Sequence, residues 1–314
     1  MRAVVMERFG GPEVLRVVRV PEPSPGPEEL LIDVVRAGVN WTDVHARTNS
    51  SWAPVELPHV PGAEVVGRTA DGRRVVGLTL AGGYAERAVV DRRMAWEVPE
   101  DIGDDEAMPL PLQGQAAWHL LFTVARIRPG QRVLVPAAAG ALGSMAVQLA
   151  AEAGARVVAL GSTEERRQLA LALGAEIAVD SAPDGLAERV RETAGGPVEV
   201  ALEMTGGAVL HETIAALAPR GRLVIYGCVG GAPTDLPTRA LMERSVTVST
   251  FWLPHLREAG AALPTSMAAL YDAIRRGTLR PMNGGVYPLG EAPAAHRALT
   301  ARTHLGKLAL DPSR

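Results

Sequence analysis

Cysteine, long apolar runs and an excess of charge are all scarce in this sequence of 314 residues. Cys228 is the one cysteine, so an internal disulfide and a cysteine-based zinc cluster are excluded. A lone thiol is typical of proteins in a reducing cytoplasm, which is where we expect this one. No window of about 20 residues is both apolar and uncharged, so no membrane-spanning helix is predicted. Glu7 and Arg8 interrupt the N-terminal stretch where a secretory signal has its apolar core.

The charge balance also limits the partners of the chain. Lys and Arg together number 32 and Asp and Glu 35, which gives a net charge of −3 with neutral histidines. Such a chain has no basic excess for binding nucleic acid or an anionic membrane surface. The composition, 47% hydrophobic and 21% charged, is that of a globular protein, and the length is sufficient for two domains with separate cores.

Residues 132–162 have the order strand, loop, helix, strand. Val133–Val135 and Val157–Leu160 are short apolar runs of the kind found in buried parallel strands. Ser144–Ala153 has the apolar periodicity of a helix, and Gly154 provides the flexible residue that often ends one. This order predicts a βαβ unit with a right-handed crossover.

The loop inside this unit has the spacing of a dinucleotide-binding fingerprint. Ala138, Gly140 and Gly143 stand at the three glycine positions of G-x-G-x-x-G, with alanine in the first. Gly140 would let the backbone approach a pyrophosphate, and Gly143 would let the helix pack closely on the strand. A tight turn between strand and helix also favours glycine for structural reasons alone. The N–H groups expected to face the phosphates belong to Ala139, Gly140, Ala141, Leu142 and Gly143.

The end of the second strand indicates which dinucleotide is bound. NAD sites carry Asp or Glu there for the ribose 2′-hydroxyl, whereas this strand ends at Ser162 and is followed by Arg166 and Arg167. A guanidinium suits a 2′-phosphate, which favours NADP. Alternatively, the two arginines pair with Glu164 and Glu165 on a solvated helix face, or those acids bind the ribose.

The rest of the chain divides by pattern. Residues 1–115 have short strand-like runs between proline and glycine clusters, typical of an antiparallel, partly closed β-domain. Residues 116–256 alternate strands with helices, which predicts a doubly wound parallel sheet with Val246–Phe251 at its edge. Residues 257–314 are too few for a third domain, so we expect them to complete the first.

A set of motifs places the chain beside a known family. They are FGGPEVL (9–15), AGVNWTD (37–43), VPGAEVVG (60–67), GGYAERAVV (82–90), AAAGALGSMAVQLA (137–150), LALGAE (171–176), PRGRLVIYG (219–227) and AHRALTARTHLGKLAL (295–310). Over its whole length the chain resembles zinc-independent medium-chain dehydrogenases/reductases of the quinone oxidoreductase group. The resemblance implies an α/β protein with a discontinuous GroES-like catalytic domain (1–115 and 257–314), a Rossmann NADP-binding domain (116–256), an active site between them, and a homodimer.

The chain departs from the zinc-dependent relatives of that family. They carry a cysteine where Asn40 stands and a histidine where Ala63 stands, so we expect no metal. Without a Lewis acid an alkoxide is poorly stabilised, whereas a quinone or an α,β-unsaturated carbonyl accepts hydride without that help. We therefore expect an NADPH-dependent reductase of a small-molecule quinone or enone. The alternatives are an alcohol dehydrogenase with a metal held by other ligands, and an NADP-binding redox sensor without turnover.

The resemblance also implies catalytic residues. Asn40 matches an asparagine placed near the nicotinamide or substrate; alternatively it is a buried amide satisfied by the backbone. Thr42 and His45 stand where zinc-dependent relatives keep a hydroxyl–imidazole proton relay. We hypothesise that Thr42, with His45 behind it, donates a proton after hydride transfer. The alternative is that His45 is an ordinary histidine on a helix surface.

Further cofactor residues are implied at the carboxyl ends of the later strands, where ligands lie in open α/β sheets. They are Thr205 after the fourth strand, Tyr226 and Gly227 after the fifth, and Phe251, Trp252 and Leu253 after the sixth. Phe251, Trp252 and Leu253 would line the nicotinamide pocket; alternatively, they pack in the hydrophobic core. Lys307 would approach the cofactor, or else is a surface lysine.

Overall fold

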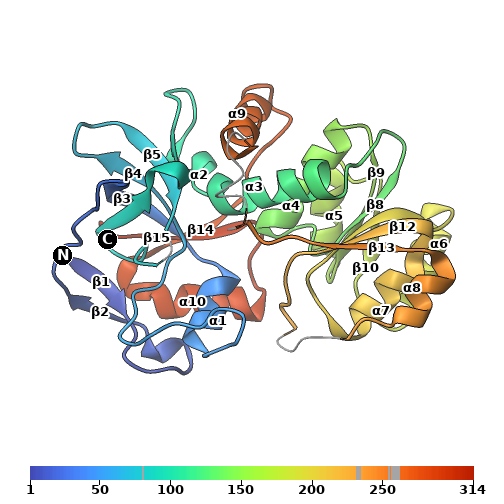
Figure 1. Ribbon diagram of the computed structural model, residues 1–314, viewed down its shortest axis with the longest axis horizontal. Helices are drawn as coiled ribbons and strands as arrows, with labels where there is room; N and C mark the ends of the chain where they lie inside the picture. The colour runs from blue at the N-terminus through green and yellow to red at the C-terminus, as the bar shows by residue number, and fades with distance from the viewer. Residues whose placement is uncertain (80, 231–234, 254, 256–261) are drawn as a thin grey trace. The chain divides into compact units, whose positions relative to one another are not determined.

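The chain divides into two compact units in the computed structural model, which describes residues 1–79, 81–230, 235–253, 255 and 262–314 (Figure 1). Unit 1 contains Met1–Gln115, Leu256–Arg275 and Pro281–Arg314, and unit 2 contains Ala116–His255 and Arg276–Arg280. The predicted return to the first domain, at residue 257, lies outside the described residues. Residues 276–280, which the sequence pattern grouped with the first domain, belong to unit 2.

Unit 2 is built on a six-stranded parallel sheet, as predicted. Its strands run in the order β10-β9-β8-β11-β12-β13, so the chain reverses direction across the sheet between β8 and β11. Open α/β sheets bind ligands at such a reversal, which is called the switch point. Strand β13 forms an edge of the sheet, as predicted for Val246–Phe251. The strands are β8 (Arg132–Val135), β9 (Arg156–Gly161), β10 (Ile177–Asp180), β11 (Val198–Glu203), β12 (Leu217–Ile225) and β13 (Thr247–Thr250).

The helices of unit 2 alternate with these strands and bury apolar faces against them. They are α4 (Ala141–Glu152), α5 (Glu164–Ala172), α6 (Leu186–Ala194), α7 (Gly207–Ala216) and α8 (Thr238–Arg244). Leu134, Val158 and Leu186 lie in one fully buried cluster with residues of the neighbouring strands. Helix α4 begins three residues before the predicted Ser144, because the end of the glycine-containing loop is already its first turn.

The start of the region predicted to alternate strands with helices, residues 116–125, is irregular. A short α-helix, α3 (Gln115–Trp118), follows the π-helical turn η3 (Leu110–Gly114) and is continued by a second π-helical turn, η4 (His119–Val124). π-Helical turns are often found at functional sites, and no pattern of side chains in the sequence predicts them.

Unit 1 is a mainly antiparallel sheet completed by the C-terminal part of the chain. Its order is β14-β15-β3-β4-β5-β7, with β6 also paired to β3. Ala309 and Leu310 of β15 pair with Gly38 and Ala37 of β3, which joins the two ends of the sequence. The strands are β3 (Glu29–Gly38), β4 (Glu64–Thr69), β5 (Arg74–Leu78), β6 (Arg87–Asp91), β7 (Ala95–Glu97), β14 (Asn283–Pro288) and β15 (Lys307–Asp311), with β1 (Arg2–Val5) and β2 (Arg16–Arg19) in a separate ribbon.

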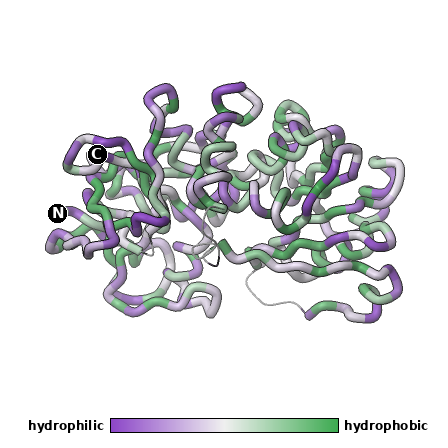
Figure 2. The backbone as a smooth tube through the Cα atoms, turned by 45° about the horizontal axis from the view of Figure 1, so that its top comes forward, coloured by the Kyte–Doolittle hydropathy of each residue, from purple (hydrophilic) through white to green (hydrophobic). Residues whose placement is uncertain are grey.

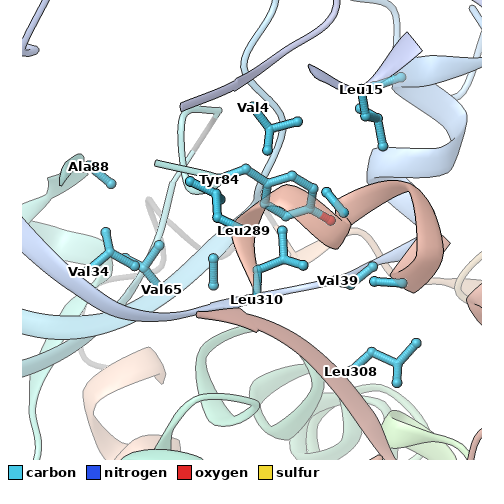
Figure 3. Close-up of a cluster of buried hydrophobic side chains, with 14 of the residues drawn as sticks. Val4, Leu15, Val34, Val39, Val65, Tyr84, Ala88, Leu289, Leu308 and Leu310 are labelled. Atoms are coloured by element: carbon cyan, nitrogen blue, oxygen red, sulfur yellow. The ribbon is translucent and has the colours of Figure 1, made fainter. Parts of the chain in front are cut away.

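The core of unit 1 is drawn from both ends of the chain. Figure 3 shows the ring of Tyr84 among aliphatic side chains, with Val4 and Leu15 from the N-terminal part and Leu308 and Leu310 from β15. Hydrophobic residues follow the strands within each unit, and hydrophilic residues concentrate in the loops (Figure 2). The helices of unit 1 are α1 (Trp41–Arg47), α2 (Asp104–Ala107), α9 (Ala262–Arg275) and α10 (Ala292–Ala301). No helix in the described ranges combines the length and apolarity needed to cross a bilayer.

Candidate functional site

The loop between β8 and α4 is tightly wound. Gly140 N–H donates to Ala137 O over 2.8 Å, and Ala138 N–H donates to Leu160 O over 3.1 Å. A Cβ at Gly143 would collide with Ala137 O, whereas a Cβ at Gly140 would meet only that oxygen, at 3.2 Å. Gly143 is therefore needed for the helix to pack closely on the loop. The space beside Gly140, called the cradle below, is open to a ligand and would be narrowed by a methyl group.

The N-terminus of α4 has no acceptor from the protein. Gly140 is its N-cap residue and no side chain caps the helix. Within the described part of the chain, the N–H groups of Ala141, Leu142 and Gly143 have no hydrogen-bond partner. These donors and the positive end of the helix dipole form the kind of position that binds a phosphate. Ala139, also predicted to contact the cofactor, has a buried side chain, which leaves only its backbone for such a contact.

Side-chain oxygens accept from backbone N–H groups at or just before the start of each of the next three helices. Helix α5 is capped by Thr163, whose Oγ1 accepts from Arg166 N–H, and in α6 the Ala187 N–H donates to Glu212. At α7, Oε1 of the buried Glu203 accepts from the N–H groups of Thr205 and Gly206 over 2.5 and 2.7 Å. Helices α5 and α6 therefore each have one first-turn N–H bonded to a side chain, whereas the Glu203 contacts precede α7, which has no side-chain cap, like α4.

The arginines after β9 have different surroundings. The Arg167 guanidinium donates to Gly161 O over 3.0 Å and to Glu164 Oε2 over 2.9 Å. Gln168 and Arg167 lower the pKa of Glu164, so this carboxylate is occupied on the helix. The pairing of Arg167 with Glu164 that was one alternative is thus present, and Ser162, at the end of β9, is exposed.

The tips of β11 and β12 are joined by backbone hydrogen bonds. Thr205 O accepts from Gly230 N–H over 3.0 Å, and Thr205 N–H is held by Glu203, so only the side chain of Thr205 remains for a ligand. Burial and the nearby Glu203 raise the pKa of Tyr226. A Cβ at Gly227 would make ordinary contact with Met204, at 3.4 Å.

The three residues after β13 have different environments. Phe251 stacks on His119, with ring centroids 6.2 Å apart and planes 18° apart. Leu253 is buried, whereas Trp252 is 45% exposed. Core packing therefore accounts for Phe251 and Leu253, and Trp252 is the member of the predicted wall that has a face available for a ligand.

Unit 1 contains a buried polar network around Asn40. The Lys307 ammonium donates to Glu64 Oε1 and Asn40 Oδ1, each over 2.5 Å, and to Val39 O over 3.1 Å. The side chains of Lys307 and Glu64 are 3% and 0% exposed. Burial lowers the pKa of Lys307, and Glu64 acts in the opposite direction. The alternative that Lys307 is a surface lysine is wrong, because the pairing of β15 with β3 carries it into the interior.

The Asn40 amide is fully occupied within this network. Its Oδ1 accepts from Lys307 Nζ and from Gln113 Nε2, and its Nδ2 donates to Glu64 Oε1 over 3.1 Å and to Gly38 O over 3.2 Å. An amide oxygen accepts two hydrogen bonds and an amide nitrogen donates two. Glu64 and Gln113 were missed by the sequence analysis. Glu64 lies within the VPGAEVVG motif, but nothing local indicates that its partner is residue 307.

A second buried cluster lies beside this network. Asp43 accepts from Gly62 N–H over 2.9 Å, from Asn40 N–H over 2.9 Å and from the Tyr84 hydroxyl over 3.0 Å. That hydroxyl is 3.1 Å from His296 Nε2. Desolvation raises the pKa of Asp43 to about 6 and lowers the pKa of His296 to about 3. At neutral pH, Asp43 is therefore ionised and His296 neutral.

The predicted proton-relay residues lie on α1. Thr42 is exposed in the first turn of the helix. His45, three residues on, is half-buried; its ring centroid lies 6.4 Å from that of Trp41, and desolvation lowers its pKa. Both residues are described by the structure, and no hydrogen bond joins their side chains.

The donor set around Asn40 does not fit a zinc ion. The Glu64 carboxylate is held by Lys307, and Asn40 and Ala63 supply no zinc ligand of the usual N/S/O kind. Across the described ranges, no group of three or more His, Cys, Asp or Glu side chains is arranged to hold a metal.

Comparison with known proteins gives the same assignment along the chain. The alcohol dehydrogenase GroES-like domain matches residues 26–100, and the zinc-binding dehydrogenase family matches residues 141–269. Quinone oxidoreductase-like protein 2 of Mus musculus is 30% identical over 298 residues, 91% of this chain and 85% of that protein. A 2-haloacrylate reductase of Burkholderia is 30% identical over 330 residues, 99% of this chain and 98% of that protein.

A solved structure extends the likeness to three dimensions. The quinone oxidoreductase of Thermus thermophilus, determined alone and with NADPH, is 38% identical with a TM-score of 0.88, over 99% of this chain and 100% of that one. The GroES-like and Rossmann architecture and the family implied by the sequence motifs are thereby confirmed. The chain belongs to the quinone oxidoreductase-like family of medium-chain dehydrogenases/reductases.

Proposed function

We propose that this protein is an NADPH-dependent reductase that transfers a hydride to a quinone or to the β-carbon of an α,β-unsaturated carbonyl compound. The observation that carries the proposal is the first turn of α4, at the switch point between β8 and β11, whose N–H groups have no acceptor among the described residues. Relatives that carry this fold and were solved with NADPH support the choice of cofactor.

The residues present fit NADPH. The cradle beside Gly140 and the donors of Ala141, Leu142 and Gly143 would hold the pyrophosphate. Ser162 and Arg166 would meet the 2′-phosphate, since a hydroxyl and a guanidinium both donate hydrogen bonds to phosphate oxygens. When bound, NADPH supplies the hydride.

The residues around Asn40 favour an electron-poor acceptor. They stabilise no alkoxide as a Lewis acid would, so oxidation of a simple alcohol lacks its usual assistance. A quinone or an enone is already activated toward hydride addition, and hydrogen-bond donors suffice for the oxyanion that develops. The relative named as a 2-haloacrylate reductase supports an activated alkene as one acceptor class.

Reduction leaves an oxyanion or carbanion that needs a proton. The Thr42 hydroxyl is exposed on α1 and shares a helix face with His45, three residues on. We propose that Thr42 passes this proton to the product, with His45 behind it. Thr42→Val should lower kcat by at least about tenfold while the Kd for NADPH is unchanged. A Thr42→Val protein with wild-type turnover would remove the relay from the mechanism.

The direct test of the function is a stopped-flow screen. NADPH and NADH are each mixed with the protein and with a naphthoquinone, an enone or an enoyl thioester, and nucleotide oxidation is followed at a single turnover. We expect NADPH oxidation with at least one acceptor. Tight NADPH binding without oxidation by any acceptor would instead favour a redox sensor.

We also propose that the protein is a homodimer that pairs through the sheet edge at β13. An edge strand presents unpaired backbone groups, and Met242 on the neighbouring α8 is 79% exposed. Sedimentation equilibrium should give twice the chain mass, and a monomer at micromolar concentration would contradict this assembly.

A further inference from the structure

The ribbon formed by β1 and β2 has an unpaired edge. Met1 and Val20 exchange both of their backbone hydrogen bonds, over 2.9 and 3.0 Å. In an antiparallel pair such an exchange recurs at every second residue, so the backbone groups of Val18 also face β1. The N–H and C=O groups of Val17 and Arg19 therefore point away from β1. Among the described strands only β1 pairs with β2, and we call this outer side the free edge of β2.

The side chains of β2 make this edge attractive to another strand. Its sequence is Arg-Val-Val-Arg (16–19), and all four residues are exposed. Val17 and Val18 are 39% and 40% exposed, on opposite faces of the ribbon. An edge strand with open backbone groups and exposed apolar side chains is a template for strand addition.

The two arginines of β2 lack counter-charges. Within the described ranges, neither the Arg16 nor the Arg19 guanidinium takes part in a hydrogen bond or an ion pair. The acids nearest to them in sequence are bonded elsewhere: Glu13 accepts from a backbone N–H over 3.0 Å, and Glu22 accepts from Arg87 over 2.7 Å. Two cations therefore flank the exposed valines of the free edge.

This arrangement of charges selects among possible occupants of the edge. If two copies of β2 paired antiparallel, Arg16 of one copy would lie opposite Arg19 of the other, and parallel pairing in register would also place arginine opposite arginine. Like charges directly opposite each other destabilise a strand pair, whereas opposite charges stabilise it. A second copy of the chain is therefore disfavoured, and an acidic strand is favoured.

We propose that the free edge of β2 is a docking site for an extended acidic segment of another protein, which adds to the ribbon as a third, antiparallel strand. The best-matched segment has two apolar residues between two carboxylates. The carboxylates would lie opposite Arg16 and Arg19, and the apolar pair opposite Val18 and Val17. Backbone hydrogen bonds would supply affinity, and the charge pairs would set the register. This inference does not depend on the proposed function.

The charge requirement is tested with two labelled peptides. Fluorescence anisotropy measures the Kd of the full chain for Ser-Glu-Val-Val-Glu-Ser and for Ser-Arg-Val-Val-Arg-Ser. Wild type should bind the acidic peptide at least about tenfold more tightly, and the double variant Arg16→Glu with Arg19→Glu should reverse that preference. The matched control, Arg220→Glu with Arg239→Glu, changes the net charge equally at two exposed positions of unit 2 and should keep the wild-type preference.

Strand addition is tested by methylating the backbone of the acidic peptide. In the antiparallel register its second valine lies opposite Val17 and turns its N–H toward β2. Its first valine lies opposite Val18 and turns its N–H away. N-methylation of the second valine should weaken binding at least about tenfold, whereas N-methylation of the first should change it less than about threefold.

Four results would overturn the proposal. If wild type binds neither peptide at millimolar concentration, the arginines serve only to keep the edge unpaired. If the control variant reverses its preference as well, the attraction is one of net charge. If both methylated peptides lose affinity equally, no strand is added. If no peptide binds and a dimer dissociates only in Arg16→Glu with Arg19→Glu, the edge belongs to a second copy.

Discussion

The polar network around Asn40 in unit 1 and the first turn of α4 in unit 2 differ in whether their hydrogen-bonding groups have partners. Around Asn40, donors and acceptors are matched among side chains, and only the outer atom of Gln113 and one oxygen of Glu64 lack a partner in the structure. At α4, the backbone donors of the first turn have no acceptor among the described residues. The network around Asn40 holds its side chains in fixed orientations, and removing one member costs much stability because its partners stay buried. The donors at α4 cost little stability when unpaired, and they are suited to an anionic ligand.

Removing one partner from the matched network should have the largest effect. Lys307→Met leaves the Glu64 carboxylate buried without its cation, and we expect a loss of about 3–5 kcal/mol in the free energy of unfolding. The measurement is urea denaturation of wild type, Lys307→Met, Glu64→Gln and the double variant. The double variant should recover much of the loss, because the uncompensated charge is gone. Strictly additive losses would show that the two side chains do not act as a pair.

The neighbouring Asp43 and His296 predict an unusual dependence on pH. The pKa of Asp43 is raised from 3.8 to about 6 in the folded state, so the folded state binds that proton more tightly and stability falls as pH rises from about 4 to 6. The pKa of His296 is lowered from 6.5 to about 3, so the folded state binds this proton less tightly. Stability therefore falls as the pH falls from about 6.5 to 3. The two dependences have opposite sign and offset each other between about pH 4 and 6.

His296→Gln should expose the contribution of Asp43 while keeping a donor toward Tyr84. Relative to wild type, the variant should gain roughly 3 kcal/mol when the pH is lowered from 6 to 4, since one pKa unit is about 1.4 kcal/mol. Urea denaturation at pH 4, 5 and 6 measures this, and the difference between the two proteins cancels the other carboxylates. Parallel pH profiles would show that the pKa of His296 is the same in the folded and the unfolded protein.

The open donors of α4 are tested with two glycines that have different surroundings. Gly143→Ala puts a methyl against Ala137 O, so it should cost about 1–3 kcal/mol of stability and weaken NADPH binding as the turn shifts. Gly140→Ala meets one atom, at 3.2 Å, with a permitted φ of −83°. It should change stability by less than about 1 kcal/mol but raise the Kd for NADPH about tenfold. Equal effects of both variants on both quantities would argue against a phosphate at this turn.

Local patterns made unit 2 largely predictable. The alternation of apolar runs with helical periodicity indicated the parallel sheet. The spacing of Ala138, Gly140 and Gly143 predicted the loop before α4 as a cofactor site from six consecutive residues, and that assignment stays a prediction. The start of α4 was misplaced by three residues because Ala141 to Gly143 read as loop in sequence but already form the first turn. The sequence could not show that Trp252 is exposed and Phe251 is packed, because two adjacent aromatic residues give no indication of which side chain is buried.

The network in unit 1 could not be predicted in this way. Lys307 and Asn40 are 267 positions apart and meet only because β15 pairs with β3. No periodicity or spacing reports such a pairing, so Lys307 could be named through family resemblance but its partner Glu64 could not. Gln113 was missed for a further reason: the π-helical turn that carries it has no sequence signature.

The smallest expected effect separates the two arginines after β9 in unit 2. Arg167 is closed: it bonds Gly161 O and Glu164 and reaches Asp180 over 3.4 Å. Arg167→Ala should therefore lower the melting temperature and leave the preference for NADPH over NADH unchanged. Arg166→Ala should weaken NADPH about tenfold, one charge-assisted hydrogen bond, and leave NADH unaffected.

The readout for both variants is the ratio of kcat/KM for NADPH to that for NADH with one acceptor, together with the Kd for each nucleotide. A change of ratio in Arg167→Ala as large as in Arg166→Ala would mean that the pairing of Arg167 with Glu164 opens when the nucleotide binds. The 2′-phosphate would then be recognised by displacing an internal ion pair.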